Sequence, residues 1–478
     1  MSLPEALDFG TIKDIETMKI STTVLDPITI TQQQAVFQIP RTGILDGGSM
    51  VQLAVTGSSD LFFPLNLGIH SLIKSVFLKV GGKVIASTEE YGHYQSIVRQ
   101  VIHPDHRAYV EMVKSGSIMD RFSADEVGRI VPRDMKLDLS AVADADRTAD
   151  VPEFIKPTTS DDTTPVFSIP LSTLIPMMKS RPLPLFAIKE HIYLEINFNT
   201  QVAAGDIGTI CCRKQGSAAS PTVTVSTSNI KFISDHLYYT QERMDAQSKR
   251  IFSSEGMGFP YVDTITTIAD VSASGVGAGV VKKQVIERKL AVSGKVVRNI
   301  LMSDKPSGTA HSTLGQYFSK DQKIPCEINY RINDQRTFDR DLASSTRQYD
   351  EVAKVFGSPL MMPSQLYSFD CDTDKDSVTQ SLNQNSVFIG LVEGHQLPNA
   401  TNTDLSNDIR GHLHYDGLDL TKTGFEVLGN GTQVGVKPII LQKTYNRVQG
   451  DDDVRKLRVF CGVERQMLLR DGEIILSD

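Results

Sequence analysis

Short runs of alternating apolar and polar residues recur along the whole chain of 478 residues, and clusters of Gly, Pro, Asn and Asp separate them. Residues 191–198 (HIYLEINF) show the alternation most clearly, because every second side chain from Ile192 to Phe198 is apolar. A side-chain period of two is typical of a half-buried β-strand. The same alternation predicts strands at 34–39, 49–56, 75–80, 83–85, 222–226, 229–234, 285–293, 296–302, 325–332, 386–392, 436–442 and 455–461. We therefore expect an all-β protein built of sandwiches or barrels.

Helical spacing is rare, and no helices alternate regularly with the strands, as a nucleotide-binding parallel sheet would require. The segments with helical spacing are 91–101, 106–116 and 237–252. The last of these lies near the middle of a chain that is too long for one core, and the strand pattern resumes after it. The sequence therefore predicts an N-terminal arm at 1–30, a first sandwich at 31–245 and a second sandwich at 246–478.

Turns and loops account for the rest of the chain. Gly81-Gly82 lies between two predicted strands and suits a two-residue hairpin turn. Long stretches without regular pattern are predicted to be loops, and loops of such length usually carry contacts or function. These predicted loops are 114–164, 203–220, the Gly/Ser/Ala-rich 270–280, 303–322, 333–363 and 395–434.

Composition narrows the classes of function. A formal net charge of -8 without a Lys/Arg-rich block argues against a surface that binds nucleic acid. The first twenty residues carry charges throughout, so no signal peptide is expected, and no run reaches the roughly 20 apolar residues of a membrane span. The five cysteines lack metal or disulfide spacing and are expected to be free thiols. They are Cys211, Cys212, Cys326, Cys371 and Cys461.

Motifs for catalysis are missing. The chain contains neither the G-x-S-x-G turn of a nucleophilic hydrolase nor the G-x-x-x-x-G-K-[ST] loop that cradles phosphate. The glycines of GVGAG at 275–279 do not have dinucleotide-binding spacing. His103 and His106 flank a Pro that breaks the helix needed to align them, so a turn at a helix start is favoured over a metal site.

Two further clusters contain side chains that can bind metals. His412 and His414 would share one face of a strand, although a polar strand or loop face is the favoured interpretation. The acidic run from Asp370 to Asp376 resembles the start of a calcium loop, but Lys375 replaces the turn glycine and Ser381 replaces the bidentate Glu. The sequence therefore predicts no catalytic residue, no cofactor and no metal ligand, and hence no enzyme.

Several segments of the first half resemble, in order, the double jelly-roll major capsid proteins of eukaryotic DNA viruses. YGHYQSIVRQV at 91–101 resembles the short helix that follows an early hairpin in that family. IPL at 169–171 and RPLPLF at 181–186 resemble the proline-rich passage into the last strands of the first roll, here 191–198. HLYYTQER at 236–243 is similar to the strand whose acidic-Arg pair marks the passage between the rolls.

The resemblance continues in the second half. IERKL at 286–290 and VRNIL at 297–301 look like the opening strands of the second roll. YSF at 367–369 with NQNS at 383–386 resembles a passage within that roll, and LRVFCG at 457–462 resembles its closing strand. The chain has no Trp and lacks the N-terminal motif common in large nucleocytoplasmic viruses, which favours the smaller relatives, the polinton-like viruses and virophages.

The resemblance implies two consecutive eight-stranded jelly rolls with long loops and a few short helices. It also implies a homotrimer that forms a pseudo-hexagonal capsomer and tiles an icosahedral shell. The expected partners are the chain itself, penton and minor capsid proteins, and an internal membrane or lining protein, without sequence-specific binding of nucleic acid. Synthesis is expected in the host cytoplasm and assembly there or in the nucleus. Because fold does not fix function, the alternatives are a carbohydrate-binding or cupin-like metal-dependent protein and a minor capsid protein.

Overall fold

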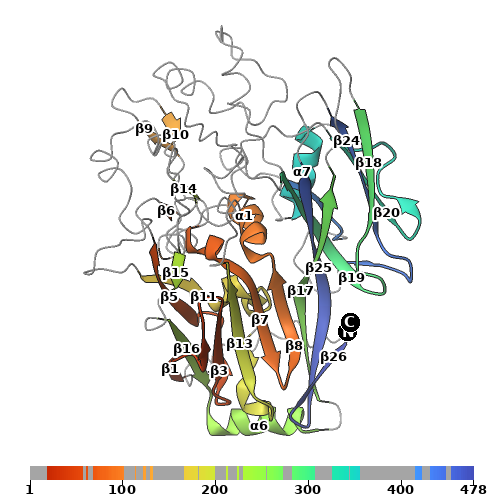
Figure 1. Ribbon diagram of the computed structural model, residues 1–478. Helices are drawn as coiled ribbons and strands as arrows, with labels where there is room; N and C mark the ends of the chain where they lie inside the picture. The colour runs from red at the N-terminus through yellow and green to blue at the C-terminus, as the bar shows by residue number, and fades with distance from the viewer. Residues whose placement is uncertain are drawn as a thin grey trace, which may run out of the picture.

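The structure of the protein, a computed structural model, contains two β-sandwiches that lie side by side (Figure 1). It describes residues 19–57, 61–62, 68–101, 114, 122–124, 130–132, 166–180, 182–199, 212–213, 223–225, 230–253, 256–272, 282–306, 326–343, 345–355, 415–421, 431–447 and 454–477. No helix in these ranges is long and apolar enough to cross a membrane. The double jelly roll expected from the sequence is confirmed.

The first jelly roll pairs a seven-stranded sheet with a five-stranded sheet. The larger sheet has the order β11-β5-β16-β4-β12, with β1 added to β16 and β15 added to β5. Its strands are β1 (Lys19–Leu25), β4 (Ile44–Leu45), β5 (Met50–Gly57), β11 (Val166–Pro170), β12 (Leu183–Pro184), β15 (Val223–Val225) and β16 (Lys231–Tyr238). The smaller sheet, in spatial order, is β2 (Thr29–Ile30), β3 (Gln34–Ile39), β13 (Ile192–Phe198), β7 (Ile73–Val80) and β8 (Lys83–Glu89).

Short helices and two small strand pairs complete the first roll. The helices are η3 (Gly68–Leu72), α1 (Tyr91–Val101), α4 (Leu171–Leu174), α5 (Met177–Ser180), η5 (Leu185–Ala187) and α6 (Gln241–Ile251). The strand pairs are β6 (Leu61–Phe62) with β14 (Cys212–Arg213), and β9 (Phe122–Ala124) with β10 (Ile130–Pro132). Helix α6 closes the end of the first roll drawn at the bottom of Figure 1.

The second jelly roll pairs a six-stranded sheet with a four-stranded sheet. The first sheet contains β17 (Met257–Val271), β25 (Arg455–Arg470), β19 (Val296–Pro306), β22 (Tyr415–Asp419), β23 (Thr432–Gln433) and β26 (Glu473–Ser477). The second, in spatial order, contains β18 (Lys282–Lys289), β24 (Ile440–Arg447), β20 (Cys326–Ile332) and β21 (Gln335–Arg336). Helix α7 (Ser345–Val355) packs against β22.

The predicted alternation accounts for the core. Along β13 every second side chain is buried, from Ile192 to Phe198, and these side chains lie in the first-roll core with Phe37 of β3 and Leu78 of β7. The hairpin turn at Gly81-Gly82 is also confirmed. Both glycines have positive φ (54° and 85°), as a type I′ turn between twisted strands requires.

The core of the first roll also contains residues from the second half of the chain. Phe259 and Tyr261 come from β17, Met467 and Leu469 from β25, and Ile474 from β26, and all five are buried in the first-roll cluster. The second core consists of residues between 269 and 463. The C-terminal hairpin β25–β26 therefore completes a sandwich whose other strands lie more than 200 residues earlier.

Several expectations need correction. The predicted loop at 395–434 contains β22 and β23, which both pair with β19. Part of the arm predicted at 1–30 is strand, because β1 pairs along its whole length with β16 and β2 pairs with β3. The helix predicted at 237–252 begins only at Gln241, since residues up to Tyr238 belong to the ladder of β16. The region 333–363 contains α7, whose buried Gln348 and Val352 show helical spacing that the loop prediction missed.

Candidate functional site: the junction between the jelly rolls

One long ladder runs through both rolls. Strands β17 and β25 pair over fifteen positions, from Met257↔Leu469 to Val271↔Arg455. At about 3.3 Å per residue this ladder is roughly 50 Å long. Its first end contributes Phe259 to the first core, and its other end contributes Val271 to the second core. The two rolls therefore share a pair of strands, which stiffens the molecule as a single block (Figure 1).

Hydrogen bonds join this ladder to the edge of the first roll. The hydroxyl of Tyr261 donates to the carbonyl oxygen of Ile85 in β8 at 2.7 Å. The backbone N–H of Ser87 donates to Oδ1 of Asp263 at 3.2 Å, and Arg465 Nη1 donates to the other oxygen, Oδ2, at 2.7 Å. Asp263 is buried, so a cation on β25 and an amide on β8 together offset the cost of desolvating its carboxylate.

A second polar contact lies at the turn that follows β8. Glu90 has a φ of 51°, a left-handed conformation that non-glycine residues seldom adopt. In this conformation its carboxylate accepts a hydrogen bond from Nε of Arg458 in the second roll at 2.7 Å, and His93 Nε2 lies 3.9 Å away. The strained turn is thus held by a charge pair that joins the two rolls.

An apolar cluster lies beside this pair. Ile97 of α1 packs with Leu301 of β19, Val352 of α7 and Phe460 of β25, all of them buried. Tyr94 of α1 packs on Phe460 with ring centroids 5.5 Å apart. Burial raises the pKa of Tyr94 above its usual value, and a hydrogen bond to Thr264 offsets only part of this rise. Helix α1 of the first roll therefore docks on the second roll by both charge and apolar packing.

The change Glu90→Gln is expected to lower the free energy of unfolding by about 1–3 kcal/mol. It removes the charge opposite Arg458, whose side chain is 7% exposed, while Glu90 is 23% exposed and retains partial solvation. Urea unfolding of the purified protein measures the difference. The neighbouring Glu89 is exposed, so Glu89→Gln is the matched control and should change stability by less than about 0.5 kcal/mol. Equal effects of the two changes would contradict the assignment.

The second roll contains a buried cluster of four charges. Lys443 of β24 crosses the sandwich and places Nζ 2.9 Å from Asp416 Oδ2 and 3.3 Å from Asp304 Oδ2. Arg455 lies 3.8 Å from the other oxygen of Asp304. All four side chains are at most 7% exposed. Burial alone would lower the pKa of Lys443, but Asp416 and its other partners raise it well above the usual value.

Weakly acidic groups surround this cluster. Burial raises the pKa of Tyr330 well above 10.0, with the carboxylate of Asp416 acting in the same direction. Burial likewise raises the pKa of Tyr445, supported by Asp304, and raises the pKa of Cys461 to about 12. These groups therefore stay neutral in the folded protein at pH values where the unfolded chain would ionise them.

The change Tyr330→Phe is expected to protect the protein at alkaline pH. Above about pH 10 the unfolded chain loses the Tyr330 proton and the folded chain keeps it, so unfolding is favoured by about 1.4 kcal/mol per pH unit. The hydroxyl of Tyr330 has no hydrogen-bond partner among the described residues, so the change should cost little at pH 7. Urea unfolding should give the variant and the wild-type protein similar free energies of unfolding at pH 7, and the variant a higher one at pH 11. Parallel losses in both proteins would contradict this.

The residues considered for metal binding or as thiols fall in different places. Cys326 and Cys461 are buried in the second core and form no disulfide, and Cys212 lies on β14. The remaining candidates lie outside the described residues: Cys211, Cys371, His103, His106, His412, His414, the run 370–376 and the segment 275–279. Among the residues that are described, no group of three His, Cys, Asp or Glu side chains is arranged to hold a metal ion.

The buried charge cluster was not anticipated from the sequence. A signal for it exists in β24, where the inward positions are Leu441, Lys443, Tyr445 and Arg447. Charged residues at inward positions of a strand imply buried partners of opposite charge. The acidic partners, Asp304 and Asp416, lie on β19 and β22, far away in sequence, so the pairing becomes visible only in the fold.

The sequence and the fold are similar to those of known proteins. Residues 32–238 match the family model described as "Major capsid protein N-terminus". The fold is similar to the capsid protein in a quasi-atomic model of the PBCV-1 virus capsid, at 11% identity and a TM-score of 0.56, covering 98% of this chain and 99% of that chain. A search of curated proteins finds no match.

Two further structures are similar as well. A chain in the cryo-EM structure of the Sputnik virophage has 10% identity and a TM-score of 0.56, with 100% of this chain and 92% of that chain covered. The mavirus major capsid protein has 10% identity and a TM-score of 0.50, with coverages of 100% and 95%. The family model matches the first roll, and the fold shared with these capsid proteins covers both rolls, so the chain has the double jelly-roll fold and its first roll matches the major capsid protein family.

Proposed function

We propose that three copies of the chain form a capsomer with a pseudo-hexagonal outline, and that these capsomers tile an icosahedral shell. The observation that carries this proposal is the ladder of β17 and β25, which locks two rolls of similar architecture into one block. Three such blocks around a threefold axis present six similar lobes, and six lobes tile a surface like hexagons. A shell subunit must hold this geometry under load, and the Glu90–Arg458 and Asp263–Arg465 contacts oppose bending at the junction.

The proposal assigns a role to each part of the chain. We assign residues 31–245, together with β1 and β2, to the first lobe and 246–478 to the second, with the C-terminal hairpin returning to the first. Residues before β1 are available to contact neighbouring capsomers or a lining layer. The proposed partners are further copies of the chain, penton and minor capsid proteins, and an internal membrane or lining protein. Assembly is proposed to take place in the host cytoplasm or nucleus, without catalysis by this chain.

Light scattering after size-exclusion chromatography tests the trimer. The proposal predicts a particle of three times 52.7 kDa that persists on dilution to nanomolar concentration. The alternative is a jelly-roll protein that binds carbohydrate or uses a metal. It predicts a monomer of 52.7 kDa that binds an oligosaccharide array or a divalent ion. That result would overturn the proposed function.

A further inference from the structure

An apolar row crosses the outer face of the larger first-roll sheet. In the ladder, Val24 of β1 is paired with Ile233 of β16, Ile233 with Met50 of β5, and Met50 with Pro170 of β11. Four apolar side chains thus stand in register across four adjacent strands. We call these four residues, together with Ile20 two positions along β1, the apolar row.

The row faces solvent and not the core. The residues that alternate with it, Phe232, Val51 and Ile169, are buried in the first-roll core, so the row points the other way. Ile20 is 61% exposed and Val24 59% exposed, and the other three members of the row, Ile233, Met50 and Pro170, are half-buried. The solvent face of an antiparallel sheet is usually polar, and a contiguous exposed apolar patch marks an interaction surface.

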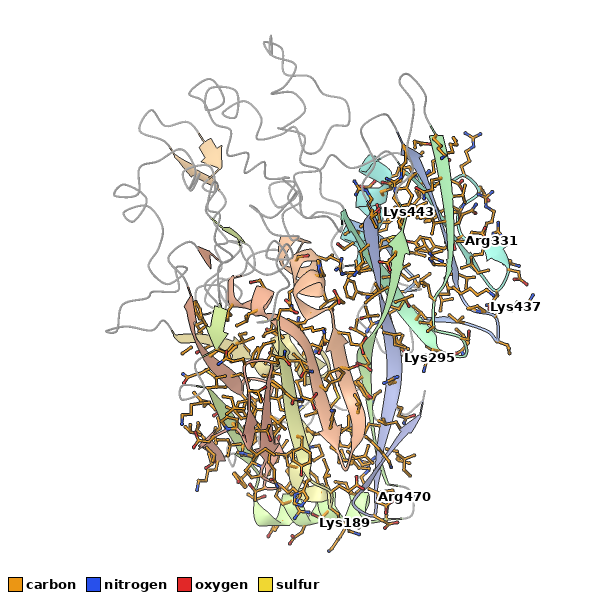
Figure 2. All side chains as sticks on the ribbon, viewed as in Figure 1. Lys189, Lys295, Arg331, Lys437, Lys443 and Arg470 are labelled. Atoms are coloured by element: carbon orange, nitrogen blue, oxygen red, sulfur yellow. The ribbon has the colours of Figure 1, made fainter. Side chains whose placement is uncertain are left out.

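The row lies on the side of the molecule away from the second roll. In Figure 1, β1, β16 and β5 are drawn at the left, and β18, β20 and β24 of the second roll are drawn at the right. Figure 2 shows Arg331 and Lys437 of the second roll at that opposite margin. The apolar row is therefore not part of the junction within one chain.

We propose that the apolar row docks on the outer sheet of the second roll, β18–β24–β20, in the next copy of the chain. This rests on the proposed trimer. A threefold ring closes through a heterologous contact, in which two different surfaces on opposite sides of the protomer meet. The apolar row and the β18–β24–β20 face satisfy that requirement.

The second surface suits this role. On its outer face β18 exposes Val285, which is 55% exposed and provides an apolar contact point. Lys283 pairs with Glu327, and Arg331 pairs with Glu287, which leaves Lys289 as an extra cation on this face.

The charges around the row are complementary to that cation. Lys231 pairs with Asp26, which leaves Asp235 on the row's face as an extra carboxylate, with its Oδ1 accepting a hydrogen bond from Thr22 at 2.6 Å. The area of this sheet face is consistent with the apolar centre of an interface. Four strands at about 4.8 Å spacing and about 20 Å length cover roughly 400 Å², which is half of the roughly 800 Å² that each partner buries in a stable interface. The row would form the apolar centre, and polar residues would form the rim.

The double change Ile20→Lys with Val24→Lys tests the contact. Both side chains are more than half exposed on an outermost strand, so the protomer should fold, which thermal unfolding checks. We expect the dissociation constant of the trimer to rise by about a hundredfold or more, so that light scattering on dilution to nanomolar concentration shows 52.7 kDa monomers of the variant where the wild-type protein remains a trimer. Val84→Lys, at another exposed apolar position, is the control and should leave the trimer intact.

Photo-crosslinking identifies the surface that contacts the apolar row. A benzophenone amino acid at position 24 should crosslink to residues 282–289 of a different chain, recognised by mixing isotopically labelled and unlabelled protein. If the wild-type protein is trimeric and the double variant is equally trimeric, or if the crosslinks join position 24 to another first roll, the inference is wrong and the proposed trimer stands. If the wild-type protein is monomeric, the proposed function itself fails.

Discussion

Deletion of residues 466–478 is expected to unfold the first jelly roll, although that roll is otherwise built from the first half of the chain. The deletion removes Met467, Leu469 and Ile474 from the first-roll core, where each is at most 2% exposed. Loss of a buried side chain of this size costs about 2–5 kcal/mol, so the three together exceed about 6 kcal/mol. A domain is stable by only about 5–15 kcal/mol. The hairpin also anchors Lys189, whose N–H donates to the carbonyl oxygen of Gly472 at 2.9 Å.

Hydrogen exchange measures this effect where it should occur. Amides of β3 and β13 in the first roll should lose protection on deletion. Leu469→Ala should lower the free energy of unfolding by about 2–5 kcal/mol, and Ile475→Ala, whose side chain is 40% exposed on the same hairpin, should have little effect. Unchanged protection in β3 and β13 would show that the first roll is complete without its C-terminal hairpin.

The change Lys443→Met is expected to destabilise the second roll by about 3–5 kcal/mol. The variant leaves Asp416 and Asp304 in the core with Arg455 as the only remaining cation of the cluster, and an uncompensated buried charge is costly. Chemical unfolding of the purified protein measures the loss. Methionine has nearly the volume of the lysine side chain, so the loss reports on charge and not on a cavity.

A second substitution provides the control for this prediction. Lys443→Met combined with Asp416→Leu removes one charge of each sign and leaves the Asp304–Arg455 pair, so most of the lost stability should return. A single variant as stable as the wild-type protein would show that Lys443 does not compensate the carboxylates. A double variant no better than the single one would show that packing, and not charge, explains the loss.

Local patterns in the sequence predicted much of the fold. Alternation located β3, β7 and β13, and helical spacing located α1. Each of these elements buries one face against a single environment, so its apolar residues follow one regular spacing along its whole length. The Gly81-Gly82 turn was predictable because few residues tolerate two successive positive φ angles.

The sequence did not predict the elements whose side chains lie in more than one environment. Strand β17 was not predicted, because its residues 257–271 meet the first core at one end and the second core at the other, and half-buried positions such as Thr266 and Thr267 blur the alternation. Strand β1 falls within the predicted arm, because its outer face exposes Ile20 and Val24 and the strand therefore shows no amphipathic pattern. The junction was invisible from the sequence since Glu90 and Arg458 lie 368 residues apart.

Electron microscopy of the purified protein tests the central claim most directly. If two rolls locked by the β17–β25 ladder build a trimeric capsomer, class averages should show a threefold particle with six lobes, and concentrated samples should contain hexagonally packed sheets or closed shells. Isolated two-lobed particles at all concentrations, without threefold assemblies, would contradict the account of this chain as the tiling unit of a capsid.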